Sequence, residues 1–418
     1  MYRKTVLRNG IRIISEQLDH LRSVSLGIWV DTGSRDEVSR ENGLSHFIEH
    51  MIFKGTQKRS SLQIAKELDA IGGLSNAFTG KENTCFYGRV LGKHFTILTD
   101  ILSDILLNST FDPDDMERER QVILQEINMM EDSPEEKIHT LFSGLFWVGH
   151  PIGMSVLGTE ESVSAVGKET ILNHLDKFYV PENIIVAAAG DVEHETLVSL
   201  FEPLFGHLKG GNAHPKRVAP NYSGGVSVHS KDLEQVHICL GGRGPSLVSE
   251  RRFACAILNT ILGGNMSSRL FQEIRENRGL AYSVYSFVSS YIDAGFLGVY
   301  VATDWRNVNP VLETIQTEVK KIGKDSISES DLAAAKDHLI GGIYLSSESA
   351  DSRMMRAAKN ELVFERYVDY QEVVSRLECI TVDEVVQVAT EIFLESDISL
   401  ATLGPFDEVD LDRSCLDF

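Results

Sequence analysis

The chain has 418 residues, of which 24% are charged and 42% hydrophobic, as is ordinary for a globular protein. This length exceeds what one hydrophobic core organises, so two domains of about 200 residues are expected. The 40 Lys and Arg residues face 61 Asp and Glu residues, and the net charge of -21 argues against nucleic-acid binding, which needs clustered cations.

The first elements predicted are strands. Residues 1–18 alternate in polarity around an Asn9-Gly10 pair, which is typical of a two-strand hairpin. A further alternating strand is expected at 23–30. The loop after it leads into the most informative stretch of the chain, residues 43–51.

Residues 43–51 predict a helix with three functional side chains on one face. His46, Glu49 and His50 are spaced i, i+3 and i+4, while the intervening residues are apolar. Two imidazoles one turn apart can bind one metal ion, and a carboxylate between them can serve as a base for hydrolysis. The spacing is the H-x-x-E-H pattern of inverted zinc peptidases. A helix that merely exposes two histidines and a glutamate is the alternative.

A second helix is predicted at 61–71, ending at a Gly72-Gly73 pair. A short strand with small polar residues follows, and a longer strand comes after it. From the residues alone, Asn76, Ala77, Phe78 and Thr79 are best interpreted as one arm of a hairpin.

A third ligand is expected from the helix predicted at 112–131, which opens with Asp and Pro start signals. Glu119 and Glu126 are seven residues apart and therefore share a face. The apolar residues Val122 and Ile123 lie between them, so we expect this face to point inward. A carboxylate on an inward face needs a partner, which is either the metal or a metal-binding histidine.

These motifs resemble the pitrilysin (insulinase, M16) family of zinc peptidases. The sequence around His46 resembles that of its processing-peptidase branch. The resemblance implies that His46, His50 and Glu126, which follows His50 by 76 residues, bind one zinc ion. It also implies that Glu49 is the general base and that Glu119 supports the ligands without binding the metal itself. By the same resemblance, residues 76–79 form an edge strand that binds extended substrate by β-augmentation.

The rest of the first half is predicted as helices at 93–107 and 134–146, a buried strand at 184–190 and a helix at 194–206. A Gly-, Pro- and Asn-rich linker at 209–225 marks the domain boundary. The predicted domains are therefore 1–208, which carries zinc, and 226–418, which does not.

The second half is predicted to repeat the element order of the first. Strands are expected at 226–230, 234–241 and, as a pair, 281–303, with a last strand near 398–405. The helices expected are 247–263, 266–277, 307–324, 328–346, 351–363 and 381–394. The fold class is thus α+β, with two homologous domains, each a mostly antiparallel sheet packed with helices.

The stretch from Asn265 to Ser283 resembles the second-half signature of the family. The resemblance assigns Arg275 and Tyr282 to substrate contact and oxyanion stabilisation. From the residues alone, a surface arginine and a core tyrosine would be the preferred interpretation.

The resemblance implies a zinc metalloendopeptidase that hydrolyses peptides or unfolded segments in a closed chamber, by zinc-activated water with a glutamate base. The expected partners are peptide substrates, with basic peptides as one alternative, and a second copy or a related chain in a dimer. Two other classes remain open. One is a non-catalytic relative that serves in assembly, and the other is a clamp that holds peptides without cleaving them.

Five widely spaced cysteines without a C-x-x-C pair predict free, mostly buried thiols in a reducing compartment. No signal or transit segment and no membrane-spanning apolar run is evident. We therefore expect a cytoplasmic enzyme of bacterial type, with a mature organellar matrix chain as the alternative.

Overall fold

The computed structural model describes residues 1–211, 217–324 and 327–416. Its two compact units are both discontinuous in sequence. The first unit contains Met1–Met129, Met154–Val218 and Leu345–Tyr367, and the second contains Met130–Gly153, Ala219–Tyr344 and Val368–Phe418. This differs from the expected continuous division, because each half of the chain contributes one helical segment to the other unit. Residues 212–216 of the expected linker lie outside the described residues.

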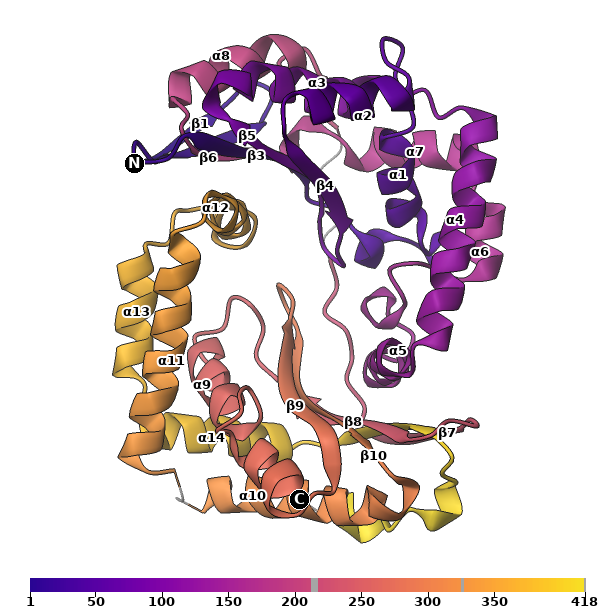
Figure 1. Ribbon diagram of the computed structural model, residues 1–418, viewed down its shortest axis with the longest axis vertical. Coiled ribbons are helices and arrows are strands. Elements are labelled where there is room, and N and C mark those ends of the chain that lie inside the picture. The colour runs from indigo at the N-terminus through magenta and orange to yellow at the C-terminus, as the bar shows by residue number, and fades with distance from the viewer. Residues whose placement is uncertain (212–216, 325–326, 417–418) are drawn as a thin grey trace. The chain divides into compact units, whose positions relative to one another are not determined.

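The first unit is built on a six-stranded sheet (Figure 1) in the order β1-β2-β6-β3-β5-β4. All neighbours are antiparallel except β2 and β6, as the sequence predicts for a mostly antiparallel sheet. The strands are β1 (Tyr2–Val6), β2 (Arg12–Gln17), β3 (Ser23–Val30), β4 (Leu74–Thr79), β5 (Thr84–Leu91) and β6 (Ile184–Gly190). In the part of the chain that the structure describes, strand β4 pairs with β5 and no other strand, so it is an edge of the sheet.

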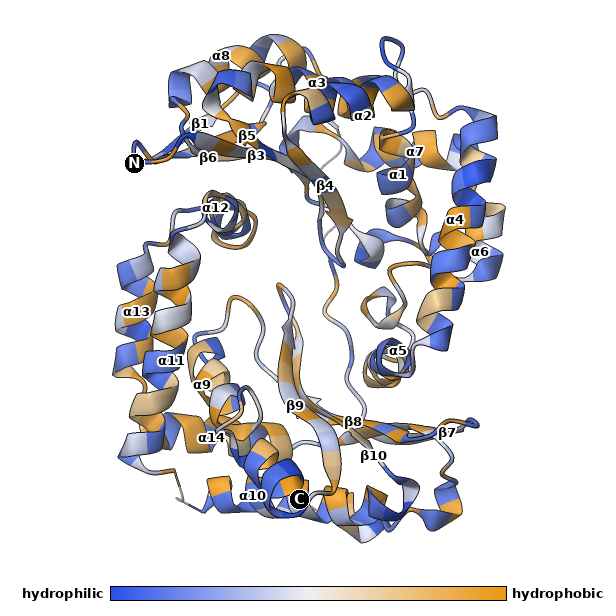
Figure 2. Ribbon diagram, viewed as in Figure 1, coloured by the Kyte–Doolittle hydropathy of each residue, from blue (hydrophilic) through white to orange (hydrophobic). Residues whose placement is uncertain are grey.

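Amphipathic helices cover one face of this sheet, and Figure 2 shows α3 and α8 with alternating apolar and polar surfaces. Sheet residues such as Leu26 and Phe86 pack there against Phe47 and Leu98. The helices of the unit are α1 (Leu44–Ile52), α2 (Ser61–Ala70), α3 (Phe95–Asn108), α4 (Pro113–Asp132), α6 (Glu160–Ala165), α7 (Lys168–Phe178), α8 (His194–Phe205) and α12 (Ala350–Phe364). Helices α6 and α7 were not predicted.

The opposite face of the first sheet is covered by α12. Met354, Ala357 and Ala358 pack against a layer that includes Trp29 and Ile185. Ion pairs hold this helix to the strands, among them Lys4 with the fully buried Glu361 and Arg89 with Asp351. Because α12 comes from the second half of the chain, this face of the sheet is covered only when both halves are present.

Within the described residues, the second unit repeats this sheet without a counterpart of β1. Its order is β7-β11-β8-β10-β9, and its one parallel pair, β7 with β11, corresponds to β2 with β6. The strands are β7 (Gly225–Ser230), β8 (Val236–Arg243), β9 (Ala281–Ser290), β10 (Gly295–Thr303) and β11 (Ser399–Gly404). This shared order is what a duplication of one α+β unit predicts.

The helices of the second unit confirm most of the prediction. They are α5 (Pro134–Phe146), α9 (Arg252–Leu262), α10 (Val308–Gly323), α11 (Glu329–Ser347), α13 (Tyr370–Cys379) and α14 (Val382–Phe393). Helix α13 was not predicted, and the helix expected at 266–277 is a shorter π-helical segment, Phe271–Asn277. Helix α5, from the first half, covers one face of the sheet with Phe142 and Phe146.

The five cysteines are free, and all except Cys379 are buried, as predicted. Among the described residues, no helix is both long and apolar enough to cross a membrane.

Candidate metal centre

Helix α1 presents His46, Glu49 and His50 along one side, as the spacing predicts. The helix is nine residues long, and its opposite side is anchored in the core of the first unit. The anchoring residues are at most 1% exposed, and they are Leu44, Phe47, Ile48, Met51 and Ile52. This packing fixes the direction in which the two imidazoles leave the helix.

Helix α4 brings Glu126 to the two imidazoles. Its Oε2 lies 3.7 Å from Nε2 of His46 and 3.6 Å from Nε2 of His50. The ligand atoms of the three residues all lie within 4.8 Å of one another. Ligands about 2.0–2.2 Å from a tetrahedral zinc ion are themselves about 3.4 Å apart, so two nitrogens and one oxygen at these separations fit zinc with little adjustment.

The electrostatics keep the imidazole of His46 available as a ligand. Burial, and secondarily the charge of His50, lower the pKa of His46 to about 4, which leaves the ring neutral at ordinary pH. The Nδ1 atom of His46 is buried, and it has no hydrogen-bond partner among the described residues. A neutral imidazole is the form that binds metal.

Glu119 orients the second imidazole. Its Oε2 lies 3.1 Å from Nδ1 of His50, and its Oε1 forms an ion pair with Nζ of Lys54 at 2.6 Å. Glu119 is 7% exposed. A carboxylate on the outer nitrogen fixes the ring and turns Nε2 toward Glu126, which is the usual outer-shell arrangement of a histidine–zinc site.

The α4 face between Glu119 and Glu126 is only partly as predicted. Ile123 is fully buried, but Val122 is 39% exposed, so the expectation that both point inward was wrong for Val122. Consecutive residues lie about 100° apart on a helix, so they cannot both face the core when the buried stripe is narrow.

Glu49 faces the edge strand. Burial is the largest influence on the pKa of Glu49 and raises it, while a hydrogen bond from Thr79 opposes that rise. The Oγ1 of Thr79 donates to Oε2 of Glu49 at 2.5 Å. A hollow of about 300 Å³ between α1 and β4 is lined by Glu49, His50 and Asn76, among others. The contact between Thr79 and Glu49 was not foreseen, because only tertiary packing brings the end of β4 to α1.

Residues Asn76 to Thr79 lie on the edge strand β4, in agreement with the expected position. All four residues are at least partly exposed, and the hydroxyl of Thr79 is turned toward Glu49. The N–H of Ala77 donates to the side-chain oxygen of Asn76 at 2.9 Å. An unpaired edge of this kind can accept an additional extended strand.

Arg275 and Tyr282 lie together in the second unit. The guanidinium of Arg275 stacks over the ring of Tyr282, 4.3 Å from its centroid, and also over Phe271 at 4.7 Å. Tyr282 is 74% exposed, so the alternative of a core tyrosine is excluded. Arg275 belongs to the π-helical segment, a backbone form often found at functional sites.

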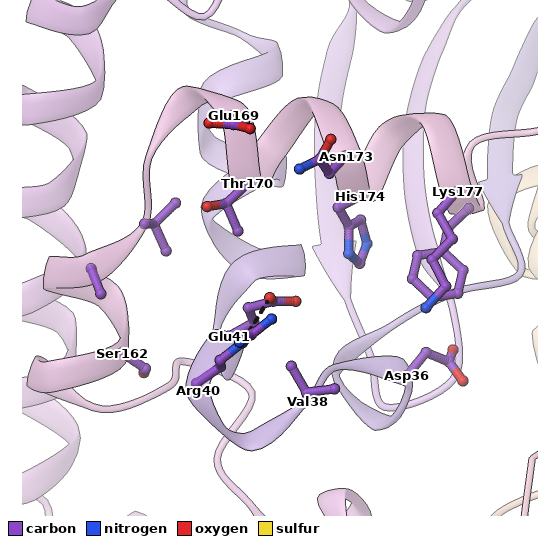
Figure 3. A pocket seen from close by; sticks show the side chains of 13 residues that line it. Asp36, Val38, Arg40, Glu41, Ser162, Glu169, Thr170, Asn173, His174 and Lys177 are labelled. Atoms are coloured by element: carbon purple, nitrogen blue, oxygen red, sulfur yellow. Dashed lines mark hydrogen bonds and ion pairs between the residues drawn. The ribbon is translucent and has the colours of Figure 1, made fainter.

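A second hollow in the first unit, of about 430 Å³, lies between the loop before α1 and helix α7 (Figure 3). His174 projects into it beside Lys177, while Asp36 and Arg40 come from the loop (Figure 3). None of the proposed zinc ligands lines it. It is therefore separate from the metal centre.

Comparisons with known proteins identify two family segments in the chain. Residues 12–160 match the family model "Insulinase (Peptidase family M16)", and residues 165–339 match "Peptidase M16 inactive domain". The motif lies in the first of these segments. The second segment does not contain the motif.

Relatives of similar length are known in several bacteria. An uncharacterized zinc protease of Bacillus subtilis (strain 168) is 37% identical over 405 residues, which cover 97% of this chain and 98% of that protein. One from Mycobacterium tuberculosis (strain H37Rv) is 40% identical over 410 residues, covering 96% of this chain and 93% of the relative.

Solved structures share the fold. A protease from Helicobacter pylori superposes with a TM-score of 0.90 at 21% identity, covering 97% of this chain and 99% of that one. A peptidase M16 inactive domain from Pseudomonas fluorescens gives 0.90 at 18% identity, with 97% and 98% covered. The family models and the relatives together show that this chain belongs to the M16 (insulinase) peptidase family.

Proposed function

We propose that the protein is a zinc metalloendopeptidase whose single zinc ion is held by His46, His50 and Glu126. The observation that carries this proposal is the convergence of three ligand atoms from α1 and α4 within 4.8 Å. The relatives named zinc proteases support the choice of metal. Three protein ligands leave one position of a tetrahedral ion for the reaction.

A bound zinc ion would lower the pKa of water and polarise the scissile carbonyl. The chain supplies the base. Glu49 lies on the same face as the ligands, so its carboxylate can take a proton from the attacking water and return it to the leaving amine. Burial raises the pKa of Glu49, which suits a group that must both accept and release a proton. Thr79 holds one carboxylate oxygen and leaves the other for this work.

Strand β4 is proposed as the substrate-binding edge. An extended polypeptide that pairs with Asn76–Thr79 would place a peptide bond beside Glu49, because the hollow at the centre is shared by these two elements. Main-chain pairing demands an extended segment, so short peptides and unfolded chains are the proposed substrates. Specificity would then come from side chains next to the edge rather than from a folded recognition surface.

Several finer features belong to the proposal through the family resemblance. They are a closed chamber, contact of Arg275 and Tyr282 with substrate, and a dimer with itself or a related chain. The proposal also includes a processing-peptidase-like role and a cytoplasmic location. The stacking of Arg275 on Tyr282 supports treating these two residues as one functional pair.

The first test is metal content and cleavage. Elemental analysis should find one zinc per chain, and cleavage of an unstructured basic peptide should be abolished by a chelator and restored by zinc. The Glu49→Gln variant should retain zinc and lose activity by about 100- to 10,000-fold, because it removes a base and not a ligand. Zinc loss from a well-folded Glu49→Gln variant contradicts this assignment. Peptide binding without cleavage by the zinc-loaded wild type would instead favour the clamp.

A further inference from the structure

A buried carboxylate lies beneath the start of the metal-binding helix. Glu37 is 5% exposed, in the loop between β3 and α1. Its Oε2 accepts the backbone N–H of Gly43 at 2.8 Å, and its Oε1 accepts that of Ser45 at 2.7 Å. The side-chain amide of Asn42 approaches Oε2 at 3.3 Å. Both carboxylate oxygens are thus engaged by the first turn of α1.

The helix has no cap of its own. The N-cap residue is Gly43, which has φ 91° and no side chain to accept a hydrogen bond. A Cβ atom there would lie 2.6 Å from the carbonyl oxygen of Leu157, so Ser, Asp or Asn could not replace it without displacing that segment. The first N–H groups of a helix need acceptors, and Glu37 supplies them from outside together with the negative charge that suits a helix N-terminus.

This arrangement carries an electrostatic cost. Burial raises the pKa of Glu37, while the hydrogen bonds from Ser45, Gly43 and Asn42 oppose that rise. Lys81 provides the nearby opposite charge, and burial lowers its own pKa to about 8. Lys81 also donates to the carbonyl of Met154 and follows Thr79 by two residues. Glu37 is therefore enclosed by α1 and by the turn that follows the edge strand.

We propose that Glu37 is a positioning residue that sets the placement of α1 and so aims His46 and His50 at the metal. Ser45, which donates to Glu37, immediately precedes His46. Helix α1 has only nine residues, so a shift of its first turn moves the ligands directly. Metal ligands must be held within about 0.5 Å of their productive geometry. This inference rests on the proposed function only in taking His46 and His50 as ligands.

The test uses cobalt(II), whose visible absorption reports the ligand geometry of a zinc site. Glu37→Gln preserves the side-chain size but replaces one acceptor oxygen with an N–H donor that opposes a backbone N–H. We expect cobalt(II) affinity to fall by about 10- to 100-fold, as for other groups that orient ligands, and the visible bands to shift. The measurements are made at a temperature where circular dichroism shows both proteins folded.

Glu361→Gln is the matched control. Glu361 is a fully buried carboxylate of the same unit, hydrogen-bonded to Lys4 at 2.7 Å and placed on α12. This variant should lower the unfolding temperature but leave cobalt(II) affinity and the visible bands as in wild type. Wild-type affinity and bands in Glu37→Gln would overturn the proposal. An equal loss in Glu361→Gln would also overturn it, since general destabilisation would then be the cause.

The outcome can be separated from that of the proposed function. If wild type binds no cobalt(II) or zinc, both proposals fail. If wild type binds cobalt(II) with bands typical of four-coordination but cleaves no peptide, the peptidase proposal fails. The spectra of the Glu37→Gln and Glu361→Gln variants still decide the role of Glu37 in that case.

Discussion

In the proposed metal centre, the role of each glutamate follows from which imidazole nitrogen its carboxylate approaches. Glu126 approaches Nε2 of both imidazoles, whereas Glu119 approaches only Nδ1 of His50. The first geometry suits a ligand and the second suits an outer-shell partner, although both glutamates come from one helix.

We expect Glu126→Gln to lose more zinc affinity than Glu119→Gln. Removing a ligand charge weakens the bond to zinc itself, whereas outer-shell changes typically cost about 10- to 100-fold. Zinc affinity is measured by competition with a chromophoric chelator. The opposite order of affinities would mean that the ligand lies two turns earlier on α4 than assigned.

His174 should make the stability of the protein sensitive to acid. Burial lowers its pKa in the folded state to about 4 from an ordinary 6.5, with Asp36 opposing the shift and Lys177 adding to it. The neutral ring is favoured by folding, so its contribution is present above pH 6.5 and is lost as the pH falls toward 4. Between pH 6.5 and 5 this loss amounts to about 2 kcal/mol at most.

The matching measurement is the free energy of unfolding from denaturant titrations at both pH values, with a chelator present so that metal release does not contribute. His174→Gln should show a smaller acid loss than wild type. The same substitution at the exposed His207 should leave the loss unchanged. An identical pH dependence in His174→Gln and wild type would refute this role.

At the scale of elements, α12 depends on small residues to approach the sheet. Ala357 and Ala358 are 2% and 0% exposed, and they pack in the same cluster as Ala187 and Ala189 of β6. Close contact of alanines brings the helix near the strands, where its ion pairs with Lys4 and the other strand residues can form.

Ala358→Leu should therefore destabilise the first unit by about 1–3 kcal/mol, the usual cost of overpacking a tight core. Ala334→Leu makes the same change at an exposed position on α11 and should be nearly neutral. Unfolding free energies of the two variants provide the comparison. Equal stability of both would show that α12 can move away from the sheet without cost.

At the scale of the whole molecule, sequence halves and structural units do not coincide. The first unit needs residues 345–367 and the second needs residues 130–153. A fragment ending at the expected linker would therefore lack the helix that covers Trp29 and Ile185. Each unit therefore needs a segment from the other half of the chain in order to be complete. The proposed function also uses residues from both units in catalysis.

Arg275→Ala and Tyr282→Phe should leave zinc content unchanged and lower kcat/KM. The loss should correspond to about one to a few kcal/mol of transition-state stabilisation, the scale of a charge-assisted contact or one oxyanion donor. The control is Arg278→Ala, a neighbouring arginine that hydrogen-bonds Thr314 instead. Full activity in both variants would mean that the second unit has a structural role only.

The oligomeric state is a separate question. Native mass spectrometry of the purified chain distinguishes a homodimer from a chain that needs a different partner.

The sequence alone determined the parts that depend on local spacing. Helix periodicity placed His46, Glu49 and His50 on one face, and alternation predicted most strands, because these patterns reflect the geometry of single elements. Two short helices, α6 and α7, escaped prediction, as did α13. The resemblance added Glu126, which no local pattern could assign to the histidines.

Tertiary structure alone decided what lies between elements. It places α5, from the first half, in the second unit and α12, from the second half, in the first unit. This is possible because an apolar sheet face can be buried by a helix from anywhere in the chain. It also brought Thr79 to Glu49 and Glu37 to the start of α1. Such contacts depend on how elements pack, and neither composition nor periodicity encodes which polar group will meet another across the core.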